Sequence, residues 1–146
     1  MGQENINVQF GAQRQYELVS ADLTLDKFDT GKLLVISSSE AAGNLAGALT
    51  CSLPAVSAVE QGFNVLVAVA SNHSHSIDGG ATALRGLVNQ VGDGGLTPGS
   101  VALTGDSSIK VGSNDDGDPR GALIEIFCDG TIWHVRATSG TPFTIS

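Results

Sequence analysis

The sequence predicts an all-β domain: a β-sandwich or jelly-roll-like antiparallel fold of about nine or ten short strands, with little or no helix. Three observations support this fold class. Apolar residues alternate with a period of two wherever a period can be found, which is typical of strands because residues two apart share a face. Glycine accounts for 19 of 146 residues, and charged residues make up only 15% of the chain. Such a composition favours short strands joined by tight turns.

Alternation is clearest in three segments, LAGALTCSL (residues 45–53), FNVLVAVA (63–70) and LIEIFC (123–128). Turn residues lie between the alternating segments, as in DTGK, LTPGS, NDDGDPRG and SGTP. One segment, ALRGLVNQV, has helical leanings, which Gly86 in its middle weakens. Further strands are expected at Ile6–Phe10, Tyr16–Leu25, Lys32–Ser37, Val101–Thr104, Ser108–Val111, Ile132–Ala137 and Pro142–Ile145.

Length and composition indicate one domain with a short leading segment. Residues 1–15 are polar and rich in Gln and Asn, so they are expected to form an extended N-terminal arm. Residues 16–146 show no compositional break and are expected to form a single β-domain. A chain of this length buries enough surface to be stable without disulfide bonds.

The charge balance excludes some classes of partner. Fifteen acidic and seven basic residues give a formal net charge of −8, and the bases are scattered, so nucleic acid binding is disfavoured. The longest apolar run, around VLVAVA, is far too short to span a membrane. The opening residues MGQENINVQF lack the basic and apolar regions of a signal peptide, which predicts a soluble protein that is not exported by that route.

The segment FCDGTIWHV collects Trp133, Cys128 and His134 around Asp129-Gly130. Asp-Gly between two alternating runs predicts a hairpin with these two residues at its centre. Alternation then places Trp133 on an apolar face and His134 on the opposite one, so a thiol–imidazole catalytic pair is disfavoured. Cys51 and Cys128 are both expected to pack in the core. A bridge between them is neither predicted nor excluded.

Two polar stretches are candidate metal sites. In NHSHSIDGG, His73 and His75 share a face if the chain is extended; with Asp78, or as three such pairs on a three-fold axis, they would suit a transition metal. A solvated loop is the favoured alternative. In SNDDGDPRG, the residues Asp115, Asp116 and Asp118 are candidate calcium ligands. The segment does not match the spacing of an EF-hand loop, so an acidic solvated turn is favoured. We therefore predict no catalytic, cofactor-binding or metal-binding residues, and a protein that is not an enzyme.

Several short motifs follow one another in a definite order over about residues 20–137. Their residues are Leu23, Thr24, Gly31, Lys32, Leu53, Pro54, Gly62, Phe63, Gly130, Thr131 and Trp133. This order resembles small β-domains of tailed-bacteriophage virions, which have a Leu-Thr strand, a Gly-Lys turn, a Leu-Pro strand end, a strand led by Gly-Phe or another aromatic residue, and a closing Asp/Asn-Gly-Thr-x-Trp hairpin. The insertion at residues 73–100 is longer than this pattern usually has.

The resemblance implies a structural role in the virion for a protein that is made in the host cytoplasm. Related domains are head decoration or cement proteins, head fibres and tail-fibre modules, usually homotrimers. A short arm followed by one domain suits a decoration protein that trimerises on the capsid surface and binds the major capsid protein. The alternative is a tail-fibre or spike module that binds a receptor or a host-surface glycan. Because Trp133 is expected to be buried and unable to stack on a sugar, we favour the decoration protein.

Overall fold

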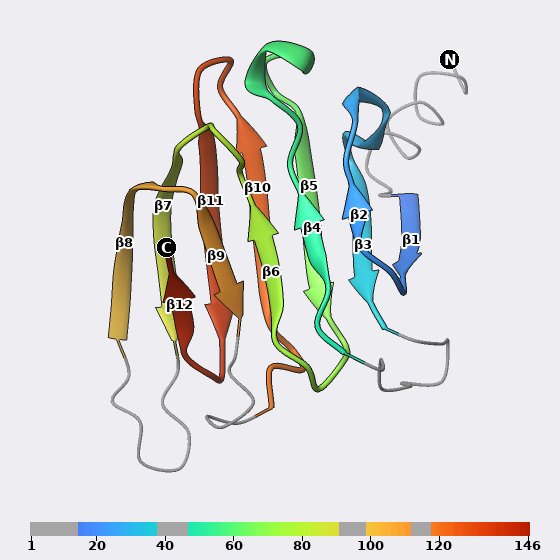
Figure 1. Ribbon diagram of the computed structural model, residues 1–146, viewed down its shortest axis with the longest axis vertical. Coiled ribbons are helices and arrows are strands. Elements are labelled where there is room, and N and C mark those ends of the chain that lie inside the picture. Colours follow the sequence, from blue (N-terminus) through green and yellow to red (C-terminus); the bar gives the residue numbers. More distant parts are fainter. Residues whose placement is uncertain (1–14, 38–46, 91–98, 112–117) are drawn as a thin grey trace, which may run out of the picture.

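The computed structural model of the chain describes residues 15–37, 47–90, 99–111 and 118–146. Within these ranges two β-sheets lie face to face, and they overlap in Figure 1 because the view is down the shortest axis. The arm predicted at residues 1–15 falls almost wholly outside the described residues, as does the strand predicted at Ile6–Phe10. The all-β sandwich is confirmed.

The larger sheet has seven strands, whose spatial order differs from their order along the chain (Figure 1). Across the sheet they are β1 (Gln15–Val19), β3 (Lys32–Ile36), β5 (Asn64–Val69), β10 (Leu123–Cys128), β11 (Trp133–Ser139), β7 (Leu84–Gln90) and β8 (Gly99–Asp106). The hairpin of β10 and β11 is thus inserted between β5 and β7.

The smaller sheet has five strands and covers one face of the larger one. Across it lie β12 (Phe143–Ile145), β9 (Ser108–Val111), β6 (His75–Asp78), β4 (Thr50–Ser52) and β2 (Leu23–Thr24). Two single-turn 3-10 helices, η1 (Lys27–Asp29) and η2 (Val56–Ala58), lie in connections between the sheets. Asp26 and Asp29 cap η1 reciprocally, each side chain accepting a backbone N–H.

Half of the strand pairings are parallel, where the sequence predicted antiparallel ones. The first seven strands alternate between the two sheets. Each of them therefore runs parallel to the strand two places before it in the chain, which belongs to the same sheet. The parallel pairs are β1–β3, β3–β5, β2–β4, β4–β6 and β7–β11. Among the described residues the other five pairings are antiparallel.

Several predicted strands lie where alternation placed them, and three segments differ from the prediction. The strand at Ser108–Val111 and the one at residues 123–128 coincide with β9 and β10. The segment predicted as one strand at Tyr16–Leu25 is divided into β1 and β2, which lie in different sheets. The segment with helical leanings is strand β7, and the segment favoured as a polar loop contains strand β6. Twelve strands are therefore present in the described residues.

The core lies between the sheets and is built almost entirely from apolar side chains that point inward from both. Trp133, at the start of β11, is fully buried, and the ring of Phe63 meets it edge-on, with 5.5 Å between the centroids. The prediction that Trp133 is buried is therefore confirmed. Cys51 and Cys128 are both buried with free thiols, which confirms the prediction that they pack in the core.

Gly86 of β7 lies unusually close to the neighbouring strand β11. A Cβ atom built on Gly86 would stand 1.8 Å from the carbonyl oxygen of Val135, which no side chain can tolerate. The φ angle of Gly86 is 151°, a conformation that other residues rarely adopt. The parallel pairing of Gly86 with Val135 thus explains why β7 has a glycine at this position.

Gly86→Ala is expected to destabilise the fold severely, by about 4 kcal/mol or more, because backbone must move to admit the new methyl group. Gly140→Ala is the matched control, since a Cβ there meets nothing within 4 Å. We expect the control to change the free energy of unfolding by less than about 0.5 kcal/mol. Urea titration followed by Trp133 fluorescence measures both. Equal midpoints for the two variants would disprove the close approach.

Candidate functional site

The hairpin of β10 and β11 turns at Gly130 and Thr131, one residue later than predicted. The strand register pairs Cys128 with Trp133, and Gly130 has a φ of 96°. The carboxylate oxygen Oδ1 of Asp129 accepts hydrogen bonds from the N–H groups of Thr131 and Ile132, at 2.8 and 2.9 Å. The predicted hairpin is therefore present, although its turn is displaced by one residue. The Asp129 side chain stabilises the turn through these hydrogen bonds.

His134 and Cys128 lie on opposite faces of the larger sheet, so they form no nucleophile–base pair. Cys128 points into the core, whereas the His134 ring stacks on Phe127 at the outer surface, with 4.6 Å between centroids. His134 Nε2 is 2.7 Å from Asp129 Oδ2. This hydrogen bond, followed by those from Ile132 and Thr131, holds the pKa of Asp129 well below its usual range. Among the described residues, no hydroxyl or thiol is bonded to the His134 ring, so the pair has no nucleophile there.

Cys51 is equally unsuited to covalent chemistry. It is buried at the inner face of β4, and this burial raises the pKa of its thiol to about 12. The thiolate, which is the reactive form, is therefore scarce at neutral pH.

His75 is a core residue and not part of a solvated loop. It begins β6 with only 1% of its surface exposed, and its Nδ1 accepts the N–H of Leu49 at 3.0 Å. Burial, together with the nearby His73, lowers the pKa of His75 to about 4, so the ring is neutral at physiological pH. Its Nε2 is buried without a hydrogen-bond partner.

The structure does not bring the three metal-site candidates of NHSHSIDGG together. Strand alternation puts Asp78 on the outer face of β6, where Oδ1 accepts the N–H of Gly80 at 2.7 Å, while His75 faces inward. No group of three His, Cys, Asp or Glu side chains able to hold a metal occurs within the described ranges.

The acidic stretch is described only from Asp118 onward; Asp115 and Asp116 lie outside the described residues. Asp118 is ion-paired with the Arg120 guanidinium and accepts the Arg120 N–H at 3.0 Å. Arg120 lowers the pKa of Asp118, so this carboxylate already has a cationic partner. Of the three aspartates considered for calcium, Asp118 is therefore already paired with Arg120.

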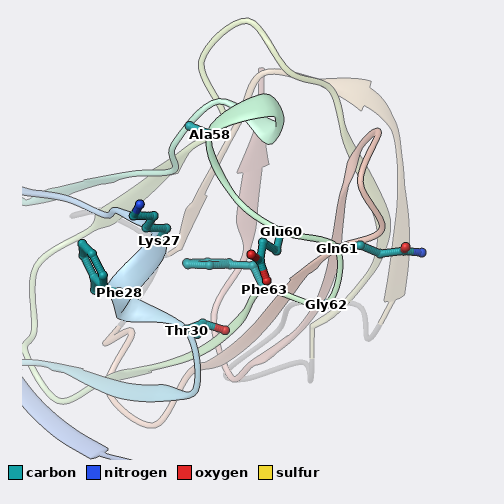
Figure 2. A pocket seen from close by; sticks show the side chains of 8 residues that line it. All are labelled: Lys27, Phe28, Thr30, Ala58, Glu60, Gln61, Gly62 and Phe63. Atoms are coloured by element: carbon teal, nitrogen blue, oxygen red, sulfur yellow. The ribbon is translucent and has the colours of Figure 1, made fainter.

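An open groove of about 490 Å³ lies at one end of the sandwich, between η1 and the turn before β5 (Figure 2). Phe28 forms one wall with 76% of its surface exposed, and Lys27 lies 5.1 Å from its ring centre. In Figure 2 the ring of Phe63 points towards the groove, while Gln61 points away from it. Thr30 and Glu60 add polar groups to the lining.

The outer face of the larger sheet carries a broad set of apolar side chains. Because laddered residues project on the same side, the strand register gives every outward position. Eight of these positions form what we call the outer apolar face, and none of the eight is buried. They are Tyr16, Leu18, Leu33, Val35, Leu66, Ala68, Leu123 and Phe127.

The outer face of the smaller sheet is of the opposite character. Its outward positions hold hydroxyl side chains with one aspartate and one lysine, and none of them is apolar. They are Thr24, Thr50, Ser52, Ser76, Asp78, Ser108, Lys110 and Thr144. One outer surface of the sandwich therefore suits water, and the other exposes large apolar groups.

Sequence reasoning missed this outer apolar face, although the sequence carries a signal for it. The runs KLLV in β3 and VLVAV in β5 are apolar on both sides of the strand, not on alternate residues alone. Such continuous runs are typical of strands that are covered on both faces. The exposed Phe28 was missed as well, because a lone Phe between polar residues gives no periodic signal.

The residues that resemble phage domains have structural tasks in this fold. Lys32 bridges Glu17 and Asp29 at 2.6 Å each, and this pairing raises the pKa of its ammonium group. Gly62 turns the chain with a φ of 92° and donates to the carbonyl of Cys128 at 2.8 Å. Phe63 and Trp133 pack against each other in the core. These matching residues therefore stabilise the fold.

Comparison with known proteins identifies no relative: no family model, curated protein or solved structure matches the chain. The resemblance to phage virion domains thus stays a prediction from the sequence. Among the described residues there is no helix of the length and apolarity needed to cross a membrane.

Protonation of His75 is expected to destabilise the fold in acid. Its pKa is about 4 when folded and 6.5 when free, so the unfolded chain binds the proton more tightly. The stability present above pH 6.5 is then lost as the pH falls towards 4, by up to about 3 kcal/mol. In His75→Asn the amide oxygen replaces Nδ1 as acceptor but does not titrate, so this component of the loss should disappear.

Urea unfolding at several pH values between 4 and 7 measures the effect. His73→Asn is the matched control, because it leaves His75 in place and should retain the acid-induced loss. Parallel pH profiles for the wild type and His75→Asn would show that His75 is not the group responsible.

Proposed function

We propose that this protein is a non-enzymatic structural component of a tailed-phage virion: a capsid decoration or cement protein that trimerises and binds the major capsid protein. The observation that carries the proposal is the outer apolar face. Contiguous exposed apolar surface of several hundred square ångströms marks a contact surface in a soluble protein. The resemblance over residues 20–137 supplies the virion setting.

The two outer surfaces suit such a role in different ways. A cyclic trimer on a local three-fold axis of a capsid presents three identical contacts to three capsid subunits. The hydroxyl-rich face of the smaller sheet offers many weak hydrogen-bonding groups, and contacts of this kind spread affinity over a wide area. The free thiols and the His134–Asp129 pair need no catalytic role in this account.

Immunogold electron microscopy tests the proposal. Antibodies against the purified chain are applied to phage particles propagated in the organism that carries the gene. Gold on the heads is expected. Gold confined to tail tips would replace the decoration protein by the receptor-binding alternative. Particles that bind no gold, while the denatured chain in the same lysate is detected by blotting, would overturn the virion role.

A second candidate function, binding of a host-surface glycan, is favoured by the groove at Phe28. An exposed aromatic ring beside Thr30, Glu60 and Lys27 combines a flat apolar surface with hydrogen-bonding groups, as saccharide sites do. Trp133 takes no part in this reading because it is fully buried.

A glycan array with wild-type protein and Phe28→Ala examines this second candidate. If the groove is a saccharide site, a bound glycan should lose at least about fivefold in affinity in the variant, since ring stacking contributes about 1 kcal/mol or more. Thr144→Ala, on the far outer face, is the control and should bind as the wild type does. Absence of binding by the wild type would remove this candidate.

A further inference from the structure

We infer that the outer apolar face binds a second copy of this chain, so that it forms the interface between protomers. The inference rests on the proposed function, which requires self-assembly, and it adds the surface through which the assembly takes place. Tyr16 is 57% exposed, Leu123 49% and Phe127 46%, and each belongs to a different part of that face.

The first argument is the two-sided character of the strands. Within β5, Val65, Val67 and Val69 are buried in the core, yet Leu66 and Ala68 on the other side are also apolar. A strand with apolar groups on both faces is expected between two covering layers. The described chain supplies only one layer, the smaller sheet, so the second layer must come from elsewhere.

The second argument is charge. Two copies of a chain with a net charge of −8 repel each other, and they approach at least cost through surfaces without an excess of carboxylates. The eight residues of the outer apolar face are uncharged, and Glu125, which lies among them on β10 beside Leu66, is paired in the strand register with Arg136 of β11. With Arg85 of β7 on the same side, two arginines against one glutamate give this side a net charge of +1. A second copy meets no like-charged cluster there.

The third argument is size. The eight residues lie on four strands, which are about 4.8 Å apart and about 20 Å long, so the outer apolar face has a plan area on the order of 400 Å². A standard protein–protein interface covers about 800 Å² on each partner. The face can therefore form the apolar centre of a contact with another protomer, with the outward side chains of β11 and β7 as its rim, whereas a short peptide would leave much of it exposed.

Light scattering after size exclusion tests the inference with the full chain. We expect a mass near three times the 14.9 kDa of one chain, about 45 kDa, for the wild type. Tyr16→Glu and Leu123→Glu are expected to reduce it to that of one chain, because each places a carboxylate in the apolar contact. Thr144→Glu adds the same charge to the opposite outer face and should retain the wild-type mass.

Urea midpoints from Trp133 fluorescence show whether each variant is folded, and at these exposed positions we expect little change in the stability of the isolated chain. An oligomer that survives both interface variants would overturn the inference but leave the proposed function intact. A monomeric wild type would overturn it too; if Leu123→Glu then lowers the midpoint, another segment of the same chain covers the face. Gold labelling of virions decides the proposed function independently of all these outcomes.

Discussion

The contact between Phe63 and Trp133 holds the two parts of the larger sheet together. Phe63 precedes β5 and Trp133 begins β11, so their packing joins the first parallel strands to the hairpin inserted beside them. Two backbone hydrogen bonds between Cys128 and the Gly62–Phe63 turn reinforce the same junction. With the hairpin held there, β11 is placed to receive β7 on its other side, at the cost of requiring glycine at position 86. The junction thus lies at the centre of the seven-strand order.

The contrast between the two outer surfaces has a physical cause that stability alone does not supply. Exposed apolar area gains nothing in water, and each square ångström removed from water is worth about 25 cal/mol. A chain that needed only to fold would place hydroxyl or charged side chains at Leu66 or Leu123, as it does at Ser76 and Lys110 on the other sheet. The unequal distribution is what the proposed contact with another copy of the chain would require.

Alternation in the sequence was sufficient to find β9 and β10, the hairpin and the burial of Trp133, because it reports which side of a strand meets the core. It could not reveal which strands are neighbours, and so the parallel pairing of β3 with β5 was missed. His75 was misread because its polarity suggested a loop, whereas one hydrogen bond from Leu49 lets it enter the core neutral. The outer apolar face depends on strand order, which places Tyr16 and Leu123 on the same sheet surface although they are far apart in the chain.

The alternate crossing of the first seven strands also bears on how the chain folds. Leu33 must find Leu66, and Trp133 must find Leu84, before either pairing yields a stabilising contact. Closing such loops costs entropy in advance, and domains dominated by distant pairings fold slowly. The β10–β11 hairpin is the main exception, since its strands are joined by one tight turn. It is therefore the least costly place for a folding nucleus, and the strands on either side can then assemble along its two edges.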